Sequence, residues 1–166
     1  MKGLIKVPLI LAVVIIVVRI GLEQVGAPGT ITFIFGVTWL HLLVPLYLGF
    51  RIAAAGGSSP FKDLFLAVFF FTLYTRLMVM ATYMLAYSLG WSASRFSVEG
   101  GGGVGAESAL QGMLITPVLN CFFALVAGTI LGMILGSITL FIKRRMASEK
   151  SLEWDGSQGR DRQSGS

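Results

Sequence analysis

Two ionisable side chains, His41 and Arg76, lie within long apolar stretches of the sequence. His41 is nine residues before Phe50, where its stretch ends, and Arg76 is twelve residues after Leu64, where the next stretch begins. A helix rises about 1.5 Å per residue, so two neighbouring spanning helices would place both side chains near the middle of a bilayer. An ionisable group at that depth costs about 3 kcal/mol or more, which makes each residue a candidate for function.

The surroundings of His41 suggest a polar site at this depth. A histidinium beside Arg76 would be repelled, so we expect a neutral His41 that packs near the guanidinium. Pro45 lacks the N–H that would bond to the His41 carbonyl, which predicts a kink and a free backbone acceptor. Thr72, Arg76 and Tyr83 share one face of the next helix. We therefore predict a ligand-binding site formed by His41, Thr72, Arg76 and Tyr83.

Arg76 has no acidic residue at its own depth in any apolar stretch. Because a buried charge must be paired, three interpretations are open. Arg76 is structural and donates to backbone carbonyls and nearby hydroxyls, or it is the counter-ion of an anionic ligand such as a lipid headgroup, a quinone oxygen or an organic anion. In the third, it meets a carboxylate on a partner protein within the membrane.

Gly128, Gly132 and Gly136 recur every four residues in the last apolar stretch, with Ala124 one step earlier. Apolar side chains gain nothing by leaving lipid for one another, so helices in membranes associate where small residues let their backbones approach. The pattern therefore predicts a helix-packing strip. It packs either against another segment of the same chain or against a partner protein or second copy.

The composition indicates an integral membrane protein. Charged residues make up 13% of the chain, about half their usual share in a soluble domain. We predict an all-α fold in which residues 1–146 form one domain, an antiparallel helical bundle. Its four transmembrane helices are expected at about 4–20, 30–50, 64–89 and 114–142. Residues 147–166 are polar and are predicted to form a disordered cytoplasmic tail.

The first apolar stretch also resembles a signal peptide. Arg19 and Glu23 interrupt it before the small residues at which cleavage would occur, and Pro28 would follow the cut, so we favour a retained helix. Arg19 and Glu23 are four residues apart and are predicted to form a local ion pair. In the longest loop, four consecutive glycines at 100–103 predict flexibility.

Basic residues cluster at one side of the predicted bundle. Four spans put both termini on the same side, and basic residues there far outnumber those on the other side, where only Arg19 and Arg95 remain. The positive-inside rule therefore predicts a multi-pass protein of the cell (plasma or inner) membrane with cytoplasmic termini. The topology and interface residues in this prediction include Arg51, Lys143, Arg144 and Arg145.

The sequence indicates no catalytic, metal or cofactor site. It has a single histidine and a single cysteine, and its glycine run lacks the ending of a phosphate-binding loop. Its basic residues flank apolar stretches, which does not indicate nucleic-acid binding. We expect the lipid bilayer as its partner and a non-catalytic role as an accessory or helix-packing subunit. The alternative is a small transporter or a protein that binds a lipid, quinone or anion at the His41/Arg76 level.

Overall fold

The structure of the chain is a computed structural model that describes residues 2–163, with side chains for residues 3–147. These residues form helices and irregular loops and no named strand. The helices are α1 (Lys2–Gln24), α2 (Gly29–Ile34), α3 (Val37–Ala55), α4 (Pro60–Leu89) and α5 (Thr116–Gln163), with a 3-10 turn η1 (Ser94–Phe96) and a π-helical turn η2 (Gln111–Ile115).

Four stretches are long and apolar enough to cross a membrane, as predicted from the sequence. They are Gly3–Gln24, Gly29–Ala55, Pro60–Leu89 and Gln111–Ala147. Two of the turns between them use a glycine in the left-handed region, Gly56 at φ 65° and Gly90 at φ 63°. The all-helical architecture and the number of candidate spans are thereby confirmed.

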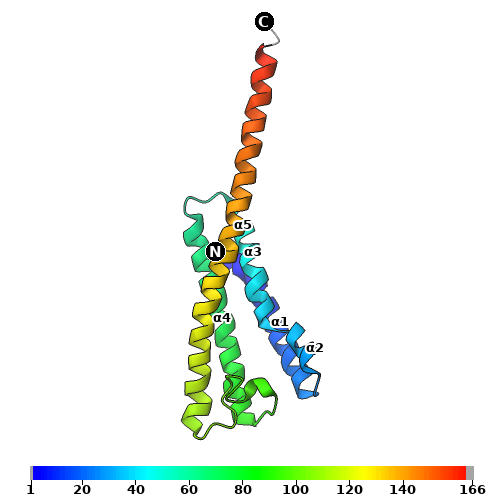
Figure 1. Cartoon of the computed structure of the whole chain (residues 1–166), viewed down its shortest axis with the longest axis vertical. Coiled ribbons are helices and arrows are strands. Elements are labelled where there is room, and N and C mark those ends of the chain that lie inside the picture. Colours follow the sequence, from blue (N-terminus) through cyan, green and yellow to red (C-terminus); the bar gives the residue numbers. More distant parts are fainter. Residues whose placement is uncertain (1, 164–166) are drawn as a thin grey trace.

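The helices form two groups that separate toward one end of the bundle. α5 packs along α3 and α4, while α1 packs on α4 and α3, and α2 contacts α1. Figure 1 shows α4 and α5 side by side, with α1 and α2 diverging from them where the 25–28 turn and the 90–110 loop lie. We call this the loop end. The divergence leaves the polar residues of this half less tightly enclosed than the core near Leu48 and Leu64, both fully buried.

The second predicted span is interrupted. Where the sequence predicts one helix over 30–50, the structure has α2 and α3 separated at Phe35 and Gly36, and Gly36 is extended with ψ 135°. A side chain on Gly36 would contact the Phe33 carbonyl oxygen at 2.9 Å and Arg19 Nη1 at 3.5 Å. The break therefore brings the chain close to the Arg19 guanidinium, a long-range approach that helix periodicity does not reveal.

The glycine strip packs within the chain. A Cβ on Gly132 would lie 2.6 Å from Val68 Cγ1 and 3.1 Å from Pro45 Cγ, so α3 and α4 both press against this face. Gly128 lies in the same way against Thr72 and His41, and Gly136 against Leu64. Ala124 is half-buried one turn before them. Of the two interpretations that the sequence allowed, this geometry favours internal packing.

The glycine-rich loop is folded rather than extended. Val98 and Val104 are joined by a backbone hydrogen bond of 3.2 Å, and the Val104 N–H donates to the Phe96 carbonyl at 2.7 Å. Phe96 is fully buried against Tyr83 and Trp91. A side chain on Gly102 would overlap the Phe96 backbone. The sequence predicts flexibility here, whereas these glycines permit close backbone contacts that a chain with side chains could not make.

Helix α5 continues beyond the last predicted span. Residues 147–166 are predicted to be disordered, and the structure continues α5 as helix to Gln163 (Figure 1). A helix that is already nucleated by a membrane span can extend cheaply, because each further residue adds one hydrogen bond. Residues 164–166 lie outside the described residues.

The closest approach of α3 and α5 is testable at Gly49. A Cβ there would overlap the Gly136 carbonyl oxygen, so Gly49→Ala must push two backbones apart. We expect a loss of about 1–3 kcal/mol in unfolding free energy, measured by reversible denaturation in detergent. Gly21→Ala is the matched control, since a Cβ on Gly21 meets nothing within 4 Å. Equal stability of the two variants would contradict this packing.

Candidate functional site

His41 is buried near the start of α3, with 4% of its surface exposed. Its Nδ1 lies 3.0 Å from the Val37 carbonyl oxygen, and its Nε2 lies 3.1 Å from Thr75 Oγ1. A carbonyl only accepts, so Nδ1 must carry a proton. Of the two neutral tautomers, only Nδ1–H fits, and Nε2 then accepts from the Thr75 hydroxyl. The imidazole therefore has both nitrogens occupied within the protein.

Thr75 was not among the predicted site residues. It is fully buried, and its hydroxyl also lies 2.9 Å from the carbonyl oxygens of Phe71 and Thr72. Thr72, which the sequence placed in the site, is buried with its methyl group beside Gly128. The sequence places Thr75 directly before Arg76. The predicted polar face includes Thr72 and Arg76, which are four residues apart, and therefore does not include Thr75.

Arg76 is half-buried on α4, close enough to His41 for an electrostatic interaction. Its Nε is buried without a hydrogen-bond partner, and none of the ion pairs among residues 3–147 includes Arg76. The sequence expected His41 to pack near, or accept from, the guanidinium. In the structure, His41 Nε2 accepts a hydrogen bond from Thr75 instead, and Arg76 is the next residue along α4.

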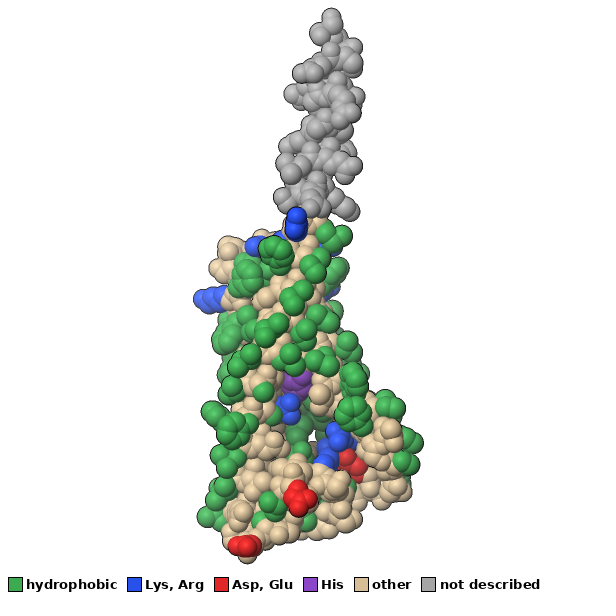
Figure 2. All heavy atoms as spheres, in the orientation of Figure 1, with side chains coloured by type: hydrophobic (Ala, Val, Ile, Leu, Met, Phe, Trp, Pro, Cys, Tyr) green, Lys and Arg blue, Asp and Glu red, His purple; other side chains and the backbone are tan. Residues whose placement is uncertain are grey.

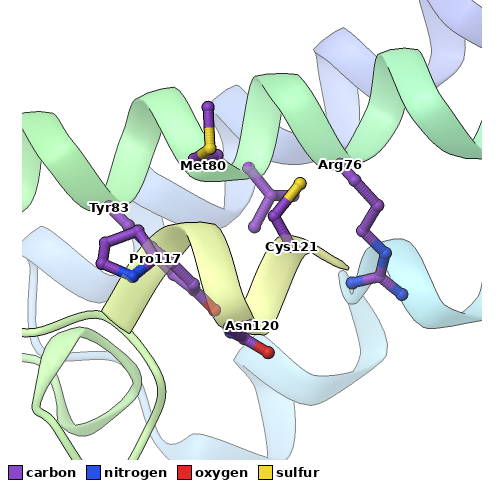
Figure 3. Close-up of a pocket in the computed structure, with 7 residues that line it drawn as sticks. Arg76, Met80, Tyr83, Pro117, Asn120 and Cys121 are labelled. Carbon is purple, nitrogen blue, oxygen red and sulfur yellow. The ribbon is translucent and has the colours of Figure 1, made fainter. Parts of the chain in front are cut away.

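A small cavity lies beside the Arg76 side chain. Its volume is about 10 Å³, enough for about one water molecule. Figure 3 shows its lining, with Met80, Tyr83 and Arg76 from α4 facing Pro117, Asn120 and Cys121 from α5. Tyr83 is buried and stacks edge-on against Phe96 at 5.9 Å. This space does not admit an organic anion, so any larger ligand must be held elsewhere.

A second group of charges lies at the loop end. Glu23 accepts a hydrogen bond from Arg19 Nε at 3.0 Å, which confirms the predicted local pair. The other Glu23 oxygen lies 2.6 Å from Arg95 Nε, in the loop after α4. One carboxylate thus joins two guanidiniums, and we call Arg19, Glu23 and Arg95 the clasp. Glu23 and Arg95 lie far apart in the sequence, and nothing in the sequence indicates that they pair.

The clasp leaves hydrogen-bonding capacity unused. Arg95 Nε and Glu23 Oε2 are close but not aligned for a hydrogen bond, and both are buried, as is Arg95 Nη2. Burial lowers the pKa of Arg95 and the Glu23 charge raises it, with Arg19 adding a smaller lowering effect. Arginine stays protonated in proteins, so the clasp carries two positive charges against one negative charge.

The clasp lines the larger recess of the loop end, which has a volume of about 440 Å³. The recess is bounded by α1, the following turn, α2 and the segment 92–95; its lining includes Arg19, Glu23, Thr32, Phe33 and Arg95. Figure 2 shows basic and acidic groups side by side on this face near the loop end. The arrangement supplies guanidinium donors with room for a small anion.

The predicted interface residues lie at the opposite end of the bundle. Lys143 Nζ is 4.7 Å from the centre of the Phe50 ring, and Arg144 donates to the Gly57 carbonyl oxygen at 3.4 Å. Arg51 is exposed there, and Arg145 is exposed and has a partner of its own. Basic groups thus lie at both ends, and at the loop end two of them share one carboxylate.

Comparisons of this chain with protein-family models, with curated proteins and with solved structures found no match. The class that fold and site define is therefore an all-helical protein with four candidate membrane spans and a basic recess at one end.

The His41–Thr75 bond predicts a specific cost at Thr75. Thr75→Val removes the donor to His41 Nε2 and leaves that nitrogen unsatisfied in the core, which should lower the unfolding free energy by about 1–3 kcal/mol. Thr82→Val is the control, because its hydroxyl bonds only to Val79 within the same helix. Nitrogen chemical shifts of the imidazole should report the Nδ1–H tautomer. Equal losses in both variants, or the other tautomer, would contradict the assignment.

Proposed function

We propose that the protein is a non-catalytic multi-pass membrane protein that binds an anionic ligand at the loop end of its helix bundle. The observation that carries this is the clasp, in which two guanidiniums share one carboxylate beside a recess of about 440 Å³. Arg76 adds a further positive charge deeper in the bundle, and Arg95 Nη2 and Arg76 Nε are buried without partners.

Charge balance supports an anion as the ligand. A cation would be repelled by the excess of guanidinium, and a neutral ligand would leave that excess uncompensated in a partly desolvated site. Hydrogen bonds from guanidinium to carboxylate or phosphate are among the stronger ones in proteins, because both partners are charged. The carboxylate of Glu23 holds the two arginines in place but neutralises only one of them.

We infer the orientation in the membrane from the basic residues at the other end of the bundle. Lys62, Arg51 and Lys143 lie at the end opposite the recess, and the positive-inside rule places that end in the cytoplasm of a cell-membrane protein. The anion site then faces the outer side.

An accessory-subunit role was the first expectation from the sequence, with the glycine strip as a docking face. Support for it is weaker, because Gly128, Gly132 and Gly136 have α3 and α4 of the same chain against them. A partner carboxylate could still meet Arg76, and co-purification of a second membrane protein whose acidic residue is needed for the complex would favour that role over anion binding.

Thermal unfolding of the detergent-purified full chain tests the proposal. Inorganic phosphate, benzoate and dodecyl phosphate, added at constant ionic strength, should raise the melting temperature if they bind. A ligand at a hundred times its dissociation constant stabilises by about 2.7 kcal/mol. Arg95→Gln should abolish the rise and Arg76→Gln should reduce it.

Lys143→Gln is the matched control, because it removes a basic charge at the other end of the bundle. Its response to each anion should equal that of the unchanged chain. If none of the three anions stabilises the unchanged chain, or if Arg95→Gln responds like Lys143→Gln, the protein does not bind anions in this recess.

A further inference from the structure

The recess lies at the height where a membrane carries its headgroups. Arg19 is seventeen residues beyond the start of α1 at Lys2, which is about 25 Å along a helix axis, and Glu23 is one turn further. The hydrocarbon core of a bilayer is about 30 Å thick. A span that starts at one boundary therefore brings the clasp close to the opposite boundary, where lipid phosphates lie.

One wall of the recess is apolar. Its walls come from α1, the turn 25–28, α2 and the segment 92–95, and no residue of α5 lines it. α2 packs on α1 alone among the substantial helix contacts. On the α2 side, Phe33 lines the recess and is 60% exposed, and the adjacent Ile34 is 65% exposed. An acyl chain would find an apolar path beside the charged recess.

The charge of the clasp selects a class of anion. Two guanidiniums and one carboxylate leave a net charge of +1. A phosphodiester carries a single negative charge and would neutralise the group, whereas a phosphate monoester near its dianionic form would leave an excess negative charge. The Arg19 and Arg95 side chains both line the recess and keep 22% and 14% of their surface exposed, so their guanidiniums supply the donors for the phosphate oxygens. Stacking on Phe96, with the guanidinium carbon 4.4 Å from the ring centre, holds the Arg95 fork in place.

We infer that the clasp recess binds the phosphodiester headgroup of an anionic phospholipid, which enters sideways from the bilayer between α2 and the segment 92–95. This inference rests on the proposed anion binding and narrows its ligand from anions in general to a membrane lipid. Arg19 and Arg95 are its binding residues, and Glu23 is the positioning residue that holds the two guanidiniums together.

Native mass spectrometry of the full chain, with three probes, separates the sources of the phosphodiester. The probes are phosphatidylglycerol, phosphatidylcholine and the chain-free headgroup glycerophosphoglycerol. We expect phosphatidylglycerol to be retained at least tenfold more than phosphatidylcholine and the headgroup alone to be lost. Arg19→Gln/Arg95→Gln should remove this preference, while Lys143→Gln/Arg144→Gln, at the other end, should keep it.

A second measurement does not depend on the folding of an arginine variant. Trp39 packs edge-on against Phe33 with ring centres 5.9 Å apart, beside the proposed opening. In a chain with Trp91→Phe and Trp154→Phe, phosphatidylglycerol with brominated acyl chains should quench Trp39 fluorescence more than the brominated phosphatidylcholine at equal content.

The outcomes distinguish anion binding in general from binding of a membrane lipid. If glycerophosphoglycerol binds as well as the intact lipid and Trp39 is quenched equally by both lipids, anion binding stands and the lipid inference is overturned. If no anionic probe binds, both fail. If phosphatidylglycerol binds but the Lys143→Gln/Arg144→Gln variant loses it, the lipid sits at the other end of the bundle and the inference is wrong.

Discussion

The close approach of α5 to α3 and α4 is the contact on which the rest of the structure depends. Side chains of Leu or Ile in lipid gain nothing by touching one another, so the helices are held where backbones can come within reach. Gly49 and Gly136 meet backbone to backbone, and Gly132 lies under Val68 and Pro45. Three helices are thereby fixed along one seam, while α1 and α2 lie outside it.

That seam decides which polar residues are satisfied and which are not. His41 lies beside Gly128, where α3, α4 and α5 are close, and its Nδ1 donates to the Val37 carbonyl while its Nε2 accepts from the Thr75 hydroxyl. Arg76 is one residue further along α4 and leaves its Nε unpartnered. At the loop end the helices diverge. There, the ion pair of Glu23 and Arg95 in the clasp connects α1 with the segment 92–95.

The same geometry relates the two proposals to the fold. A bundle packed closely along its whole length would have no recess, and one without Glu23 would carry two unpaired guanidiniums beside it. Glu23 compensates half of that charge and leaves a net charge that a single anion balances. The ordered glycine loop contributes by holding Arg95 over the ring of Phe96, itself buried against Tyr83. The glycine-rich loop, which the sequence predicts to be flexible, thus positions Arg95.

The amino-acid sequence alone determined the helical class, the four apolar spans and the small-residue face, because each depends on local composition and on spacing along a single helix. It also identified the pair of Arg19 and Glu23, which are one helical turn apart. The break at Gly36, the acceptance of the Thr75 hydrogen by His41 and the union of Glu23 with Arg95 were decided by the tertiary structure. The two contacts join residues from different helices or loops, and the break lies where Gly36 approaches Arg19 of α1. No periodicity in the chain encodes which distant groups will meet.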